Sequence, residues 1–131
     1  MNRVELEAHY RRYIDCLNAR RLDEAEAFYC DELLYNGERI SRAQWRRSAI
    51  EDSLAAVPDL QWHIRHLVIE GEHVAARLAD TGTLRAEWRG VRPSSKPARF
   101  GENVFYRFRD GRTDEVWSIV DVLALEGASS A

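Results

Sequence analysis

The chain has 131 residues and a mass of 15.2 kDa, which suits one globular domain with a substantial core. Its net charge of −3, without basic runs interleaved with aromatic residues, argues against a nucleic-acid partner. Its longest apolar runs are far too short for a membrane span, and its first residues lack the apolar core of a secretory signal. We therefore expect a cytoplasmic protein with no membrane partner, whose two cysteines, Cys16 and Cys30, are reduced thiols in helices.

The first half of the chain is predicted to be helical. Apolar residues recur at helical spacing over residues 3–20, which predicts an amphipathic helix there. A second, shorter helix is expected to begin near Asp23, with Glu26 three residues later as its capping partner. A third helix is expected to begin at the capping box of Ser41 and Gln44 and to stop at Pro58.

From residue 60 the apolar pattern alternates with a period of two, which is typical of strands. Four long strands are predicted over residues 60–69, 74–87, 98–108 and 113–125, and residues 127–131 read as a flexible tail. We therefore predict one α+β domain over residues 1–126, with three helices on a strongly curved antiparallel sheet. Such a sheet closed off by helices makes a cone-shaped barrel with an interior cavity.

The last two strands are predicted to form a hairpin, because Asp110-Gly111 between alternating runs is typical of a type I′ turn. If Arg109 pairs with Arg112, one face carries apolar residues and two acids. Its members are Phe100, Glu102, Val104, Tyr106, Phe108, Trp117, Ile119, Asp121 and Leu123. A carboxylate on an apolar face is costly unless it is bonded or useful, so Glu102 and Asp121 are candidate site residues.

A short strand or loop is also expected over residues 33–37. The order helix, helix, short strand, helix, long meander resembles the nuclear-transport-factor-2-like superfamily. Within it, the segment from Phe105 to Asp121 resembles the closing hairpin of SnoaL-like polyketide cyclases, whose pattern ends in an acid/base aspartate. The resemblance implies that Asp121 is the catalytic residue and that the protein is a polyketide or ester cyclase. Leu84 stands where a histidine is common in that family, and Ser95 where a glycine is common.

We expect cofactor-free aldol-type chemistry on a small apolar compound that contains a carbonyl group. The alternatives are a non-catalytic module of the same fold, which binds a ligand or another protein, and another acid/base enzyme such as an isomerase or hydratase.

The other predicted site residues surround Asp121. Glu102 is expected to tune Asp121 or to hold the polar end of the ligand, unless it pairs with Arg77 or Arg85. Aromatic and aliphatic walls are expected from Trp117, Trp62, Phe100, Tyr106 and Ile119, although core packing also explains the tryptophans. Asn36 would donate to a carbonyl oxygen, although a turn with Gly37 explains it without any function.

No metal site is predicted, because His63 and His66 are three apart on a strand and face opposite sides unless a bulge intervenes. A homodimer is expected, since helices cover one side of the sheet and the other side needs its own cover. The predicted interface residues are Val116, Ser118, Val120 and Val122, with Phe105 from the neighbouring strand.

Overall fold

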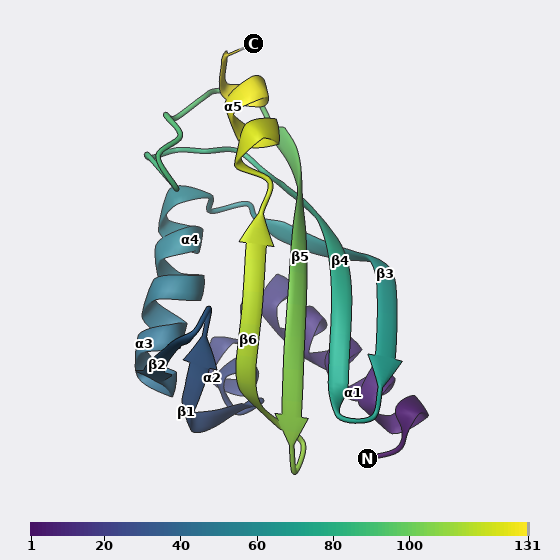
Figure 1. Ribbon diagram of the computed structural model, residues 1–131. Helices are drawn as coiled ribbons and strands as arrows, with labels where there is room; N and C mark the ends of the chain where they lie inside the picture. The colour runs from purple at the N-terminus through teal and green to yellow at the C-terminus, as the bar shows by residue number, and fades with distance from the viewer. Residues whose placement is uncertain (131) are drawn as a thin grey trace.

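A computed structural model describes residues 1–130, with the side chains of residues 1–126, and Figure 1 shows its architecture. The helices are α1 (Arg3–Asn18), α2 (Leu22–Glu26), α3 (Arg42–Trp45), α4 (Asp52–Ala56) and α5 (Val122–Ser130), and a π-helical stretch, Arg46–Glu51, joins α3 to α4. The strands are β1 (Tyr29–Tyr35), β2 (Glu38–Ser41), β3 (Gln61–Glu70), β4 (His73–Gly82), β5 (Ala98–Arg109) and β6 (Arg112–Val120). The predicted α+β class is confirmed.

The strands form one curved, open sheet in the order β2-β1-β6-β5-β4-β3. Neighbours are antiparallel except for β1 and β6, which run parallel, so the sheet is mixed rather than purely antiparallel as predicted. Figure 1 shows α1 behind the long strands, with α3 and α4 beside β1 and β6. The helices therefore close the concave side of the sheet, where the core lies.

The first helix follows from its own sequence. Asn2 caps α1, because its side chain accepts a hydrogen bond from the Glu5 N–H while Glu5 accepts one from the Asn2 N–H, both 2.9 Å long. The predicted apolar stripe is buried against the sheet; its members are Leu6, Tyr10, Tyr13, Ile14 and Leu17. Burial of this stripe stabilises a helix that would be marginal alone.

The closing hairpin contains a β-bulge that reverses the faces of β6. The turn is as predicted, with positive φ at Asp110 and Gly111 and with Arg109 opposite Arg112. Phe108 then pairs with Thr113, but Arg107 pairs with Glu115, so Asp114 is one extra residue on β6. The Arg107 guanidinium holds the buried Asp114 carboxylate with two hydrogen bonds of 2.9 and 3.1 Å. Every later residue of β6 therefore lies on the face opposite to the predicted one.

Several predicted boundaries are wrong. Cys30 lies in β1 rather than in a helix, although both cysteines are free thiols as expected. Asp23 and Glu26 do not cap α2; they bind the Arg46 guanidinium at 2.6 and 2.7 Å. The fourth long strand ends at Val120 because Asp121 caps helix α5, which begins at Val122. This helix occupies residues 122–130, residue 131 lies outside the described residues, and the flexibility of the tail stays a prediction.

The end of the sheet near α5 also carries the long connection between β4 and β5, residues 83–97, as Figure 1 shows. Backbone hydrogen bonds tie this connection down: Arg85 donates to Ala56, and Ser94 donates to Leu84. The loop Pro-Ser-Ser-Lys of the sequence therefore sits over one end of the core. None of the helices in the described part of the chain is long and apolar enough to cross a membrane.

Candidate active site

An interior cavity lies between the concave side of the sheet and helices α1, α3 and α4. It measures about 40 Å³ and has room for roughly three water molecules. Aromatic and aliphatic side chains form most of its wall, and the polar side chains in the wall include Ser53, Asp80, Glu102 and Ser118. The last three come from the adjacent strands β4, β5 and β6, so a polar strip crosses an otherwise largely apolar surface.

Asp80 and Glu102 form a carboxyl pair in this strip. Glu102 stands opposite Leu78 and Asp80 opposite Phe100, so the two acids are diagonal neighbours on the inward face. Asp80 is only 1% exposed. Burial, together with the hydrogen bond and negative charge of Glu102, raises the pKa of Asp80 to about 10. Asp80 is therefore protonated at neutral pH and acts as a donor.

One oxygen of the pair lacks a partner. Among the side chains that the structure describes, Asp80 Oδ1 is the buried polar atom without a hydrogen bond. Leaving such an atom unpaired costs about 1–3 kcal/mol, so a water or a ligand atom is expected to bind there. Because Asp80 lines the cavity, that partner would lie inside it.

Four buried tyrosines bring hydroxyl groups to the same core. Tyr10 donates to the Tyr106 hydroxyl at 3.1 Å, and the hydroxyls of Tyr13 and Tyr29 are 2.8 Å apart. Burial raises the pKa of all four phenols, so they stay protonated. Each pair uses one of its two hydroxyl hydrogens and leaves the other free. Because Tyr13, Tyr29 and Tyr106 line the cavity, the spare hydrogens can serve a ligand oxygen.

Ser118 is the third residue of the polar strip, and a residue outside the cavity, Asn36, holds its backbone in place. Its hydroxyl donates to Glu102 Oε2 at 3.2 Å. The Asn36 side chain binds the Ser118 backbone on both sides, accepting from its N–H at 2.8 Å and donating to its carbonyl at 3.3 Å. Asn36 therefore locks the β1–β2 hairpin onto β6 and is not part of the cavity wall. The predicted contact of Asn36 with a ligand is replaced by a positioning role.

Of the other predicted residues, Glu102, Tyr106 and Trp62 line the cavity. Phe100 is buried on the inward face and meets the Trp88 ring edge-on, with centroids 5.7 Å apart. It supports the Trp88 ring rather than forming the wall. The residues of β5 and the inward direction of Glu102 were therefore predicted correctly from the sequence.

The residues predicted from β6 lie outside the cavity. Trp117 and Ile119 are 47% and 73% exposed on the outer face. The exposed Asp121 carboxylate accepts a hydrogen bond from the Ala124 N–H at 3.1 Å and so caps α5. Their predicted inward direction is wrong because the bulge at Asp114 shifts the alternation of β6 by one residue. Asp121 is also not the diagonal neighbour of Glu102, and its catalytic role stays a prediction.

Sequence reasoning missed Asp80, although a signal for it exists. Residues Val74, Ala76 and Leu78 alternate along β4, and Asp80 is next in the same series. The rule that singled out Glu102, an acid at an inward position of an alternating strand, applies equally to Asp80. The two acids meet because β4 pairs with β5 in a register that single-strand patterns do not reveal.

The described residues contain no cluster of side chains suited to bind a metal ion. A register shift between Ile64 and His66 places His63 and His66 on the same outer face, opposite Ala79 and Arg77. The bulge that the prediction allowed for is therefore present. Arg77 also faces outward, where it donates to Asn103 at 3.2 Å, so it does not pair with Glu102.

The curved sheet and the helices on its concave side are those of the nuclear-transport-factor-2-like class of folds. Within this class, the sequence profile of the SnoaL-like polyketide cyclases matches residues 7–128. The chain belongs to the SnoaL-like polyketide cyclase family. Nothing among the curated proteins matches the chain significantly.

Solved structures agree with this assignment. A SnoaL-like polyketide cyclase from Agrobacterium tumefaciens is 30% identical over 93% of this chain and 95% of that one, with a TM-score of 0.87. IdmH from Streptomyces antibioticus, a proposed polyketide cyclase, is 21% identical over 96% and 99%, with a TM-score of 0.84. AclR from Streptomyces galilaeus, a proposed hydroxylase, is 24% identical over 95% and 94%, with a TM-score of 0.82. The last two similarities show the shared fold alone.

Proposed function

We propose that this protein is a cofactor-independent acid/base enzyme that moves a proton at the carbon next to a carbonyl group, as in aldol-type ring closure. The observation that carries the proposal is the Asp80–Glu102 pair, two carboxyl groups that are diagonal neighbours in the wall of an interior cavity, where burial and Glu102 raise the pKa of Asp80. Paired acids whose environments separate their proton affinities are typical of acid/base sites. Membership of the cyclase family is consistent with this chemistry.

In the proposed reaction, Glu102 takes the proton from the substrate carbon. The enolate oxygen that develops accepts a hydrogen bond from the Tyr106 hydroxyl, and a second one from Asp80, whose single proton turns from Glu102 to the substrate once Glu102 is protonated. The enolate carbon then attacks a second carbonyl of the same molecule and forms the new carbon–carbon bond. The resulting alkoxide takes the proton back from Glu102, so charge and protons balance without an oxidant or a reductant.

The size of the cavity favours a second candidate, an isomerase in which the proton returns to a different carbon. A volume of about 40 Å³ is far below the roughly 300–1,000 Å³ of a usual ligand pocket. A small substrate fits this space with modest movement, whereas a polycyclic one requires the β4–β5 connection to move away. Both candidates use the same proton abstraction by Glu102.

A diketone probe tests the shared step and the ring closure together. In D₂O, 2,5-hexanedione can exchange the hydrogens next to its carbonyls and can cyclise to 3-methylcyclopent-2-enone with loss of water; NMR follows both. We expect the wild type to accelerate exchange, and Glu102→Gln to lower the rate by roughly 10²–10⁴. Asp80→Asn should also slow exchange because it removes the protonated donor.

Asp121→Asn is the matched control, because it makes the same change as Asp80→Asn outside the cavity and keeps the α5 cap. We expect it to retain the wild-type rate. A wild-type rate no higher than buffer with this probe would instead support an inert pocket in a binding or association module. Loss of activity in Asp121→Asn but not in Glu102→Gln would contradict the proposed site.

We also propose that a second copy of this chain covers the outer face of the sheet. One row of paired positions across that face is apolar and consists of Val68, Ala75, Phe105 and Trp117. The next row toward the β3–β4 turn is charged and consists of Glu70, His73, Arg107 and Glu115, and the row on the other side consists of His66, Arg77, Asn103 and Ile119. A two-fold axis along the apolar row would place the apolar rows of the two copies on each other and bring Glu70 of each copy opposite His66 of the other.

This interface differs from the predicted one. Val116, Ser118 and Val120 face the interior and Val122 belongs to α5, whereas Phe105 remains on the outer face. Sedimentation at micromolar concentration should show a dimer for the wild type and a monomer for Phe105→Glu. A wild-type monomer would contradict this proposal and leave the cavity chemistry unaffected.

A further inference from the structure

A tight turn at one end of the cavity holds an arginine in an unusual conformation. Trp88 and Val91 exchange backbone hydrogen bonds of 3.0 and 2.8 Å, and the two residues between them, Arg89 and Gly90, have φ of 52° and 78°. Positive φ at both central positions defines a type I′ turn, which favours Asn, Asp or Gly at its first central position. Asn36-Gly37 and Asp110-Gly111 follow that preference, whereas Arg89-Gly90 does not. Positive φ is costly for a long side chain, and strained backbone positions of this kind cluster at functional sites.

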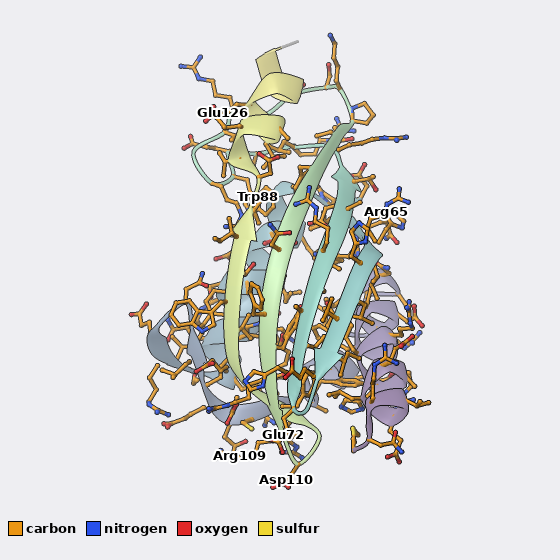
Figure 2. The ribbon with its side chains drawn as sticks, turned by 45° about the vertical axis from the view of Figure 1, so that its right-hand side comes forward. Arg65, Glu72, Trp88, Arg109, Asp110 and Glu126 are labelled. Atoms are coloured by element: carbon orange, nitrogen blue, oxygen red, sulfur yellow. The ribbon has the colours of Figure 1, made fainter. Side chains whose placement is uncertain are left out.

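The turn places the Arg89 guanidinium beside the cavity wall. Its central carbon lies 4.8 Å from the centre of the Trp88 ring, and Trp88 lines the cavity. Figure 2 shows Trp88 near the end of β6 and α5, at the opposite end of the sheet from the Asp110 turn. Among the residues that the structure describes, no carboxylate forms an ion pair with Arg89, in contrast to Arg46 or Arg107. The cation is therefore positioned but not neutralised.

A polar path joins this cation to the carboxyl pair. Burial raises the pKa of Tyr35, and the positive charge of Arg89 and hydrogen bonds with Ser118 and Arg89 oppose that rise. The Tyr35 hydroxyl is thus near both Arg89 and Ser118, and the Ser118 hydroxyl donates to Glu102. Tyr35, Ser118 and Glu102 all line the cavity. A ligand along this path would meet acid/base groups at one end and a cation at the other.

We infer that the site takes a small oxo acid, whose carboxylate binds Arg89 at the cavity mouth while its carbonyl group reaches Asp80 and Glu102. The inference rests on the proposed function and names the substrate class of the same site. Arginine suits this task because its planar N–H groups pair with carboxylate oxygens even when one face of the guanidinium covers an aromatic ring. The small cavity agrees with a ligand of a few heavy atoms.

Charge selectivity can be measured with two probes of nearly the same shape, 4-oxopentanoate and its neutral analogue 4-oxopentanamide. Calorimetry with the wild type should show at least about tenfold tighter binding of the carboxylate, as a charge-assisted hydrogen bond provides. Arg89→Asn removes the cation and supplies a residue that a type I′ turn favours, so the variant should fold and show no preference. Arg89→Lys should keep part of the preference. Arg112→Asn, at the far turn of the sheet, should keep all of it.

Equal affinity for the two probes in the wild type, or no binding of either, would overturn the inference. A preference that persists in Arg89→Asn would overturn it as well. The two proposals fail separately, because binding and hydrogen exchange are different measurements. Exchange of 2,5-hexanedione without a preference for the oxo acid would leave the acid/base proposal standing and refute this one. The reverse pattern would support oxo-acid binding in a pocket that does not catalyse exchange.

Discussion

As the pH rises, the free energy of unfolding of the variant Asp80→Asn should increase relative to that of the wild type. In the folded state the pKa of Asp80 is raised from 3.8 to about 10, so folding takes up one proton between these values. The contribution of Asp80 to the free energy of unfolding of the wild type is then highest below pH 4. Above pH 4 this contribution falls by about 1.4 kcal/mol per pH unit. Asparagine binds no proton, so the free energy of unfolding of Asp80→Asn does not decline with pH in this way. Between pH 6.5 and 9 the variant should gain on the order of 3 kcal/mol relative to the wild type.

Urea unfolding of both proteins at several pH values in that window, followed by tryptophan fluorescence, measures this difference. Groups that titrate alike in both proteins cancel, including His9, whose pKa is lowered by burial. The buried tyrosines do not interfere, because the unfolded chain ionises them only near pH 10. A gain of this size is a large part of the stability of a small domain, typically about 5–15 kcal/mol. Parallel stability curves for the two proteins would refute the reasoning that Asp80 holds a proton in the cavity.

Three further substitutions test the elements that frame the site by the same unfolding measurement. Asp121→Ala removes the α5 cap and should lower the free energy of unfolding by about 1 kcal/mol, whereas Asp121→Asn should not; equal losses would contradict the capping role. Asn36→Ala removes both hydrogen bonds to the Ser118 backbone and should cost about 1–3 kcal/mol, with faster amide exchange at Ser118; unchanged exchange would show that Asn36 does not hold β6. Gly82→Ala puts a methyl group into the Val57 side chain and should cost about 1–3 kcal/mol, and a neutral result would mean that the chain relaxes there.

Features determined by local chemistry were predictable from the sequence. The Asp110-Gly111 turn, the stripe of α1 and the Ser41 cap, whose side chain accepts from the Gln44 N–H at 3.1 Å, depend only on near neighbours in the chain. The class of fold followed from the order of these elements. The inward direction of Glu102 followed from alternation within β5, which no bulge interrupts.

The site itself depended on two facts that local patterns do not contain. Asp114 enters β6 as an extra residue, and the arginine that stabilises it, Arg107, lies on the other strand of the hairpin. Alternation counted across that position therefore assigns Asp121 to the wrong face. The partner of Glu102 is Asp80, which is brought to it by the pairing of β4 with β5 across a long connection. Asp80 was not predicted, although its place in an alternating apolar run is a signal that could have identified it.

The parallel pairing of β1 with β6 has a consequence for how the chain folds during synthesis. Tyr35 pairs with Val116, so β1 cannot pair with β6 until the ribosome has made about 80 more residues. At roughly 5–20 residues per second, the ribosome needs about 4–16 s to supply it. During that interval Tyr29 and Leu33, both buried in the finished protein, have no sheet to cover them. A nascent chain stalled before residue 112 should therefore bind chaperones through β1 and be sensitive to protease, and should lose both properties once β6 is complete.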